Sequence, residues 1–195
     1  MARVDIKILT PDPAERRARL GTPSDSPLPE ELTLDNLLRE SLSPLYLTLR
    51  VRVTVSGEKI TLGKISCVSG ALSRVLEGAE YAYILVATLG FGADRRIARA
   101  TAESTSCGFI TDALADCYIE SLADYVSREI ITPELSSGEK LGRRFSPGYA
   151  DLALGFSKDI IDMTGASARL GIRFTESGLM TPKKSITAVI PIYKK

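Results

Sequence analysis

One long amphipathic segment, residues 110 to about 131, constrains the fold more than any other part of this chain. Its apolar residues recur at the 3.6-residue spacing of an α-helix: Ile110, Ala113, Leu114, Cys117, Tyr118, Leu122, Tyr125, Val126 and Ile130. A helix with such a stripe buries one face against a hydrophobic core. The sequence therefore predicts a single long helix that packs along the body of the protein.

The same segment carries a second stripe, made of acidic residues. They recur at every fourth position: Asp112, Asp116, Glu120 and Asp124. Like charges at this spacing destabilise a helix by about 0.2–0.5 kcal/mol per pair, so local stability does not explain the stripe. Two interpretations stay open. The stripe is a solvated face with Asp124 relieved by Arg128, or its acids face a cation, either Arg144 or a positively charged ligand.

The other segments predict short helices and strands that do not alternate regularly. Helices are expected at residues 13–20, 31–41, 68–76 and 151–163, and in a segment that Asp94 caps and that is interrupted near residues 104–108. Strands are expected at residues 4–9, 45–55, 59–65, 81–88, 171–175 and 186–192, with a hairpin turn at Ser56 and Gly57. This order favours an α+β fold with a mainly antiparallel, twisted sheet flanked by helices.

Residues 21–30 are rich in Pro and Ser and predict a link between two parts of the chain. Residues 1–30 are accordingly interpreted as an N-terminal appendage with its link, and residues 31–195 as the main body. Near the other end, Lys183 and Lys184 precede the last predicted strand. They are interpreted as edge-strand protection or as part of a contact surface.

Composition excludes several kinds of chemistry. The chain has no His, which rules out a His-ligated metal and any catalytic triad with an imidazole base. Cys67, Cys107 and Cys117 lack CxxC spacing, which argues against a disulfide framework and a thiolate metal site. With 25 basic and 24 acidic residues, there is no electrostatic case for nucleic acid or an anionic membrane. These absences favour binding over catalysis.

Features of targeting and of membrane insertion are also missing from the sequence. The N-terminus lacks the basic-then-apolar pattern of a signal peptide, and no apolar run is long enough to span a bilayer. The protein is expected to be cytoplasmic.

The most informative loop is Arg144-Phe-Ser-Pro-Gly-Tyr149. Pro147 fixes φ at one turn position and Gly148 accepts a positive φ at the next, so a tight turn is predicted. That turn holds a guanidinium, which suits a carboxylate, close to a Tyr ring, which suits a flat or cationic group. Gly148 also allows a ligand to approach the main chain. The plain alternative is a surface turn with a solvated Arg144.

Three segments together resemble the activation domain of vitamin B12-dependent methionine synthase. The 144–149 loop matches the RxxxGY loop of that family, and residues 120–126 resemble the helix that precedes it. Thr175-Glu176-Ser177, followed by Pro182 and Ser185, resembles the downstream TES segment. The order and rough spacing agree, and the resemblance is specific between about residues 110 and 190. The short chain resembles a free-standing member of the family.

The resemblance implies a binding site for S-adenosylmethionine (SAM), with roles for five residues. Arg144 would bind the carboxylate of the methionine portion. Backbone groups of Ser146 and Gly148 would receive the adenosine, and Tyr149 would pack near the reactive end. Glu120 would face the sulfonium or the amino group. No metal ligand and no catalytic residue is expected.

The function implied is that of an activation subunit rather than a self-sufficient enzyme. An electron donor of the flavodoxin or ferredoxin type would first reduce cob(II)alamin carried by a partner. SAM would then methylate the reduced cobalt. The partner would be a cobalamin-binding methionine synthase or a related corrinoid protein. One alternative is a fold relative without SAM that serves as a structural or regulatory subunit of a corrinoid system. The other is a self-contained SAM-dependent methyltransferase, for which the chain lacks the usual glycine-rich strand-turn-helix.

Overall fold

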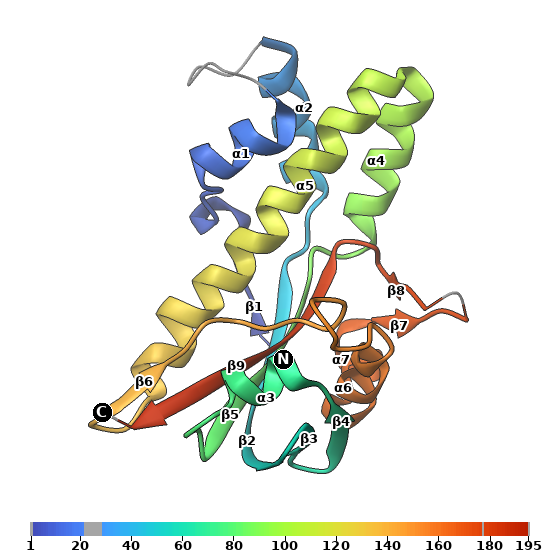
Figure 1. The fold of residues 1–195 in the computed structure, drawn as a ribbon. Helices are drawn as coiled ribbons and strands as arrows, with labels where there is room; N and C mark the ends of the chain where they lie inside the picture. Colours follow the sequence, from blue (N-terminus) through green and yellow to red (C-terminus); the bar gives the residue numbers. More distant parts are fainter. Residues whose placement is uncertain (1, 22–28, 177, 195) are drawn as a thin grey trace.

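A central antiparallel sheet organises the chain in the computed structural model, which describes residues 2–21, 29–176 and 178–194 (Figure 1). The strands are β1 (Ala2–Arg3), β2 (Leu45–Ser56), β3 (Lys59–Leu62), β4 (Ile65–Val68), β5 (Tyr81–Thr88), β6 (Glu139–Leu141), β7 (Arg173–Phe174), β8 (Met180–Thr181) and β9 (Ser185–Lys194). The main sheet has the order β4-β3-β2-β5-β9-β6, with β1 beside β2, while β7 and β8 form a separate hairpin. The predicted α+β class with a mainly antiparallel sheet is confirmed.

The helices flank this sheet. They are α1 (Pro13–Leu20), α2 (Pro29–Ser41), α3 (Gly70–Val75), α4 (Phe91–Glu103), α5 (Thr105–Tyr125), α6 (Phe156–Thr164) and α7 (Ala166–Leu170), with a π-helical turn at Val126–Ile131 and 3₁₀ turns at Ile6–Ile8 and Thr132–Glu134. The predicted long helix is α5 together with the π-helical turn. Ser104 caps it by accepting from the Cys107 N–H. Within the described residues, no helix has the length and apolar character needed to cross a membrane.

The core has two parts, one on each face of the sheet, and β5 contributes to both. Tyr83, Leu85 and Ala87 point toward α2 and α5, whereas Ile84 and Val86 point toward α3, α6 and α7. This alternation follows from the two-residue period of a strand. Because β5 is covered on both faces, it reads as one continuous apolar run, and its predicted bounds match the structure.

The hairpin of β2 and β3 is confirmed, and three other strand predictions are corrected. Residues 4–9 do not form a strand. Val4 and Leu9 fill the core, and a 3₁₀ turn at Ile6–Ile8 separates them with Ile8 47% exposed, so the apolar alternation did not mark a strand. The predicted strand at 59–65 ends at Leu62, and β4 then forms a third strand. The predicted strand at 171–175 is reduced to β7, which pairs with β8.

Two predicted helix starts are wrong because each acidic side chain has a remote partner. Asp94 does not cap α4, which begins at Phe91. Its carboxylate lies in the first turn and accepts from the Lys183 N–H. Asp151 does not begin a helix either, because α6 starts at Phe156 and the Asp151 carboxylate bonds to the start of α3.

The N-terminal residues contact the body closely. β1 pairs with β2, and Val4 and Leu9 belong to the same core cluster as α5. Residues 22–28 of the predicted link lie outside the described residues. The division into an appendage and a body therefore stays a prediction.

Candidate functional site

A cleft of about 1090 Å³ lies beside α5. Its walls come from three places: one face of α5, the 144–149 loop, and the residues that lead into β9. Residues from α1, the β8 hairpin and α6 complete the lining: Arg19, Met180 and Ser157. The cleft thus joins the acidic stripe to the loop that the sequence singled out.

The loop is attached to the sheet at its start. Phe145 and Val189 exchange both backbone hydrogen bonds, at 2.9 and 2.8 Å, and this fixes the chain against β9. Beyond it, the Tyr149 N–H donates to the Ser146 carbonyl at 3.3 Å, with φ of +91° at Gly148. Pro147, the second residue of this turn, is buried. The predicted tight turn is confirmed.

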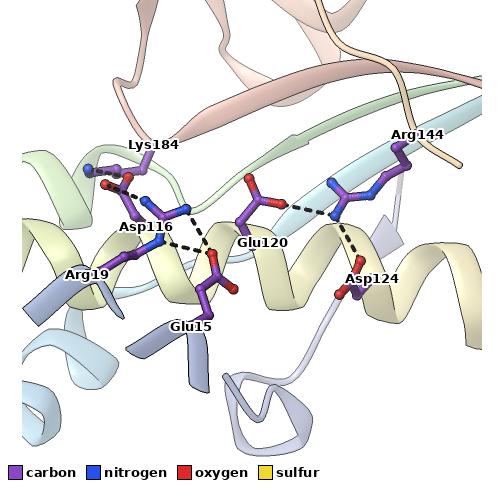
Figure 2. A network of polar contacts seen from close by, with 7 residues as sticks. All are labelled: Glu15, Arg19, Asp116, Glu120, Asp124, Arg144 and Lys184. Carbon is purple, nitrogen blue, oxygen red and sulfur yellow. Dashed lines mark hydrogen bonds and ion pairs between the residues drawn. The ribbon is translucent and has the colours of Figure 1, made fainter. Parts of the chain in front are cut away.

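Arg144 contacts the C-terminal half of the acidic stripe (Figure 2). Its Nη2 lies 2.9 Å from Glu120 Oε2 and 2.8 Å from Asp124 Oδ1. The Arg144 side chain is 20% exposed, against 28% for Glu120 and 49% for Asp124. The Arg128 guanidinium, suggested as the local relief, is 3.9 Å from Asp124. Of the two interpretations, the one in which the acids face a cation is therefore correct for this half.

Lys184 contacts the N-terminal half of the stripe. Its Nζ lies 3.0 Å from Asp112 Oδ1 and 2.6 Å from Asp116 Oδ1, with the lysine side chain only 9% exposed. On the other oxygen of Asp116, Arg19 of α1 approaches to 3.5 Å and is itself held by Glu15 (Figure 2). The interpretation of Lys184 as edge-strand protection is wrong, since this lysine is buried beneath α5.

The structure brings most of the predicted site residues together. Glu120, Arg144, Ser146 and Tyr149 line the cleft, and Gly148 lies next to them rather than among them. The Tyr149 ring is 66% exposed. Glu120 and Arg144 touch each other directly, although the sequence assigned them to different parts of a ligand. The ligand roles of all five residues stay predictions.

The sequence missed three lining residues that come from distant segments, namely Arg19, Ser157 and Thr187, and it singled out Lys183 only as edge-strand protection or part of a contact surface. The one available signal was the acidic stripe itself, which requires more cations than Arg144 alone. It did not indicate which of the chain's 25 basic residues would meet it.

Two of the cysteines are not activated. Burial raises the pKa of the Cys67 thiol and of the Cys117 thiol to about 11. Both thiols are therefore neutral near pH 7 and poor nucleophiles. The charged groups that line the cleft suit ligand binding instead.

Among known proteins, this chain matches solved structures but no family model and no curated sequence. Among solved structures, the chain is similar to the MetH reactivation domain bound to AdoHcy, with a TM-score of 0.59 and 19% identity. The match covers 83% of this chain and 62% of that chain. At this identity the likeness establishes the fold, and the chain spans less than two thirds of its neighbour's length.

Proposed function

We propose that this chain is a SAM-binding activation subunit that supports reductive methylation of cob(II)alamin in a separate cobalamin-dependent methionine synthase or a related corrinoid methyltransferase. The observation that carries the proposal is the meeting of Arg144 with Glu120 and Asp124 in one cleft, beside the turn at Ser146–Tyr149. The fold it shares with the MetH reactivation domain bound to AdoHcy supports the same conclusion.

The cleft suits a ligand that carries charges of both signs. SAM has a carboxylate, an amino group and a sulfonium at one end and a flat adenosine at the other. In this proposal Arg144 binds the carboxylate, Glu120 faces the amino group or sulfonium, and Ser146 and Gly148 receive the adenosine through their backbone groups. Tyr149 packs near the reactive end. The cleft volume of about 1090 Å³ slightly exceeds the usual range for small-molecule sites, roughly 300–1,000 Å³, so the cleft is large enough for this ligand.

The ion pairs of Arg144 are compatible with a ligand carboxylate. Both contacts to the stripe use Nη2, and a guanidinium has further N–H donors on Nε and Nη1. Asp124 is 49% exposed, and ion pairs this exposed are worth only about 0–1 kcal/mol. A ligand carboxylate can therefore replace Asp124, or bind beside it, at small cost. Glu120 meanwhile holds the Arg144 side chain toward the cleft.

The chain's own part in the reaction is positioning. SAM would supply the methyl group, and the cobalamin of the partner would accept it after reduction by a flavodoxin- or ferredoxin-type donor. Arg144 and Glu120 orient the charged end of the ligand, and the turn at Ser146–Tyr149 orients the rest. Such orientation contributes to the rate by fixing the reacting groups near each other.

One observation favours a second candidate function. Arg144 pairs with two carboxylates of its own chain, as expected for a fold relative that has lost SAM and serves as a structural or regulatory subunit of a corrinoid system. In that case the Arg144 pairs attach the loop to α5.

Calorimetric titration with SAM and with AdoHcy separates the two candidates. The proposal expects saturable binding to one site, which Arg144→Ala weakens about 100-fold because the ligand carboxylate loses its partner. A matched control is Arg99→Ala, which removes an exposed arginine that pairs with Glu103 on α4. It should change the affinity less than about twofold. Absence of SAM binding, both alone and with a corrinoid methyltransferase present, would instead support the structural subunit.

A further inference from the structure

We infer that Asp151 is a positioning residue for the cleft, which fixes the turn at Ser146–Tyr149 to the start of α3. This inference rests on the proposed function for the identity of the ligand. The attachment itself is independent of any ligand.

Asp151 forms the long-range contact that carries the inference. Its carboxylate accepts hydrogen bonds from the Ser69 hydroxyl, from the Gly70 N–H at 2.8 Å and from the Ala71 N–H at 3.2 Å. Each of these donors lies 80 or more positions away in the sequence. Ser69 is buried and also accepts from the Leu72 N–H at 3.0 Å, so the donors belong to a well-fixed element.

Asp151 lies two residues beyond the turn, between Ala150 and Leu152, and Leu152 is hydrogen-bonded to the turn. The Gly148 N–H donates to the Leu152 carbonyl at 2.8 Å, and the Leu152 N–H donates to the Tyr149 carbonyl at 3.1 Å. The turn therefore has two attachments. Before it, Phe145 pairs with Val189 of β9, and after it Asp151 bonds to α3. If the second attachment is lost, the chain beyond Phe145 is held mainly by its own local hydrogen bonds and by Leu152, which is 2% exposed.

The backbone at Ala150 supports this interpretation. Ala150 lies between the turn and Asp151 with φ of +50°, a left-handed conformation in which it is alone among the non-glycine residues described. A side chain in this region is unfavourable, and such conformations persist where the surroundings hold them. The hydrogen bonds on both sides of Ala150 provide that constraint.

The contact uses both carboxylate oxygens of Asp151, since Oδ1 accepts from the Ser69 hydroxyl and Oδ2 from the Gly70 N–H. The hydrogen bond from the Ser69 hydroxyl, followed by those from the Ala71 and Gly70 amides, lowers the pKa of Asp151. An asparagine has nearly the same shape but no charge and only one oxygen to accept from these donors. Asp151→Asn therefore weakens the attachment without removing the volume of the side chain.

A tryptophan reporter tests the attachment without any ligand. The chain has no Trp, so Tyr149→Trp places a single fluorophore on the turn. In this background Asp151→Asn should increase quenching of the fluorophore by acrylamide and lower its anisotropy. Asp159→Asn, which neutralises an exposed carboxylate in the first turn of α6, is the matched control and should change neither. Far-UV circular dichroism and thermal unfolding establish that each variant is folded.

Affinity for SAM is then measured in the protein that keeps Tyr149. Asp151→Asn should weaken binding about tenfold, since a site whose support is lost holds its contacts less precisely. Asp159→Asn should leave it within twofold. If Asp151→Asn fails to fold, Ser69→Ala removes one donor from the other side of the contact and should give the same changes in fluorescence and affinity.

The outcomes separate this inference from the proposed function. Unchanged fluorescence in Asp151→Asn would overturn the attachment, and changed fluorescence with unaltered affinity would overturn its role in the site. If the parent protein itself binds no SAM, the proposed function fails, whereas the fluorescence still decides whether Asp151 fixes the turn.

Discussion

The two halves of the acidic stripe on α5 use the same kind of residue for different purposes. Asp112 and Asp116 meet Lys184, whose side chain is 9% exposed, and whose carbonyl accepts from the Leu89 N–H at the end of β5. Glu120 and Asp124 meet Arg144, which belongs to a loop and is 20% exposed. Both halves contribute residues to the cleft, but the first half is joined to the sheet and the second to the 144–149 loop.

This difference separates a structural contact from an exchangeable one. A buried ammonium that loses its partners is costly, so the Lys184 cluster holds α5 on the sheet. A partly exposed guanidinium can exchange carboxylates at little cost, which leaves Arg144 able to accept a ligand. Equal spacing along one helix face therefore does not give equal contacts, because the two opposing cations differ in burial.

Stability should distinguish the halves most strongly. Lys184→Met keeps the apolar stem but removes the cation that Asp112 and Asp116 share, so that Asp116 keeps only its longer contact to Arg19 at 3.5 Å among the pairs described, and it should lower the free energy of unfolding by about 2 kcal/mol. Arg144→Met should lower it by less than about 1 kcal/mol. Urea denaturation followed by far-UV circular dichroism measures both. Equal losses would show that the two clusters do not differ in this way.

Ligand affinity should show the opposite order. Glu120→Gln removes the charge proposed to face the cationic end of SAM and should weaken binding about tenfold. Asp112→Asn neutralises an acid of the same stripe that does not itself line the cleft, although its partner Lys184 does, and should change the affinity less than about twofold. Calorimetric titration of both variants provides the measurement. A similar loss in both would point to the overall charge of α5 instead of to a contact of Glu120.

Asp124 offers a finer test within the second half. If its carboxylate competes with the ligand for Arg144, Asp124→Asn should strengthen SAM binding by up to about threefold, the scale of an exposed ion pair. The same titration measures it. A weaker affinity would contradict competition and would make Asp124 a ligand contact.

The sequence predicted the parts of the fold that local interactions determine. The apolar run of β5 and the turn at Gly57, where φ is +61°, are properties of a few adjacent residues, and so is the turn at Pro147 and Gly148. The stripe of α5 was predicted for the same reason, because its period is visible along the chain.

The errors concern residues whose partners are distant in sequence. Asp94 was interpreted as a helix cap and Asp151 as the first residue of a helix, yet Asp94 bonds to Lys183 and Asp151 to the start of α3. Lys184 was assigned to an edge because nothing near it in the sequence shows that α5 lies over it. In the candidate site, the 144–149 loop and Glu120 were identified, whereas Arg19 required the packing of α1 on α5.

Salt should produce the smallest effect and sharpen the contrast between the halves. At 1 M NaCl the screening length falls to about 3 Å, which weakens exposed ion pairs far more than buried ones. The stability loss of Arg144→Met should therefore shrink by roughly 0.5 kcal/mol or less, toward zero, whereas that of Lys184→Met should persist. Urea denaturation at about 0.05 and about 1 M NaCl measures the change in the free energy of unfolding. Arg99→Ala, which removes the exposed pair with Glu103, is the control. A loss in Lys184→Met that also disappears in salt would mean that the Lys184 cluster is accessible to water and exchangeable, and the distinction between an anchoring half and a binding half of α5 would not hold.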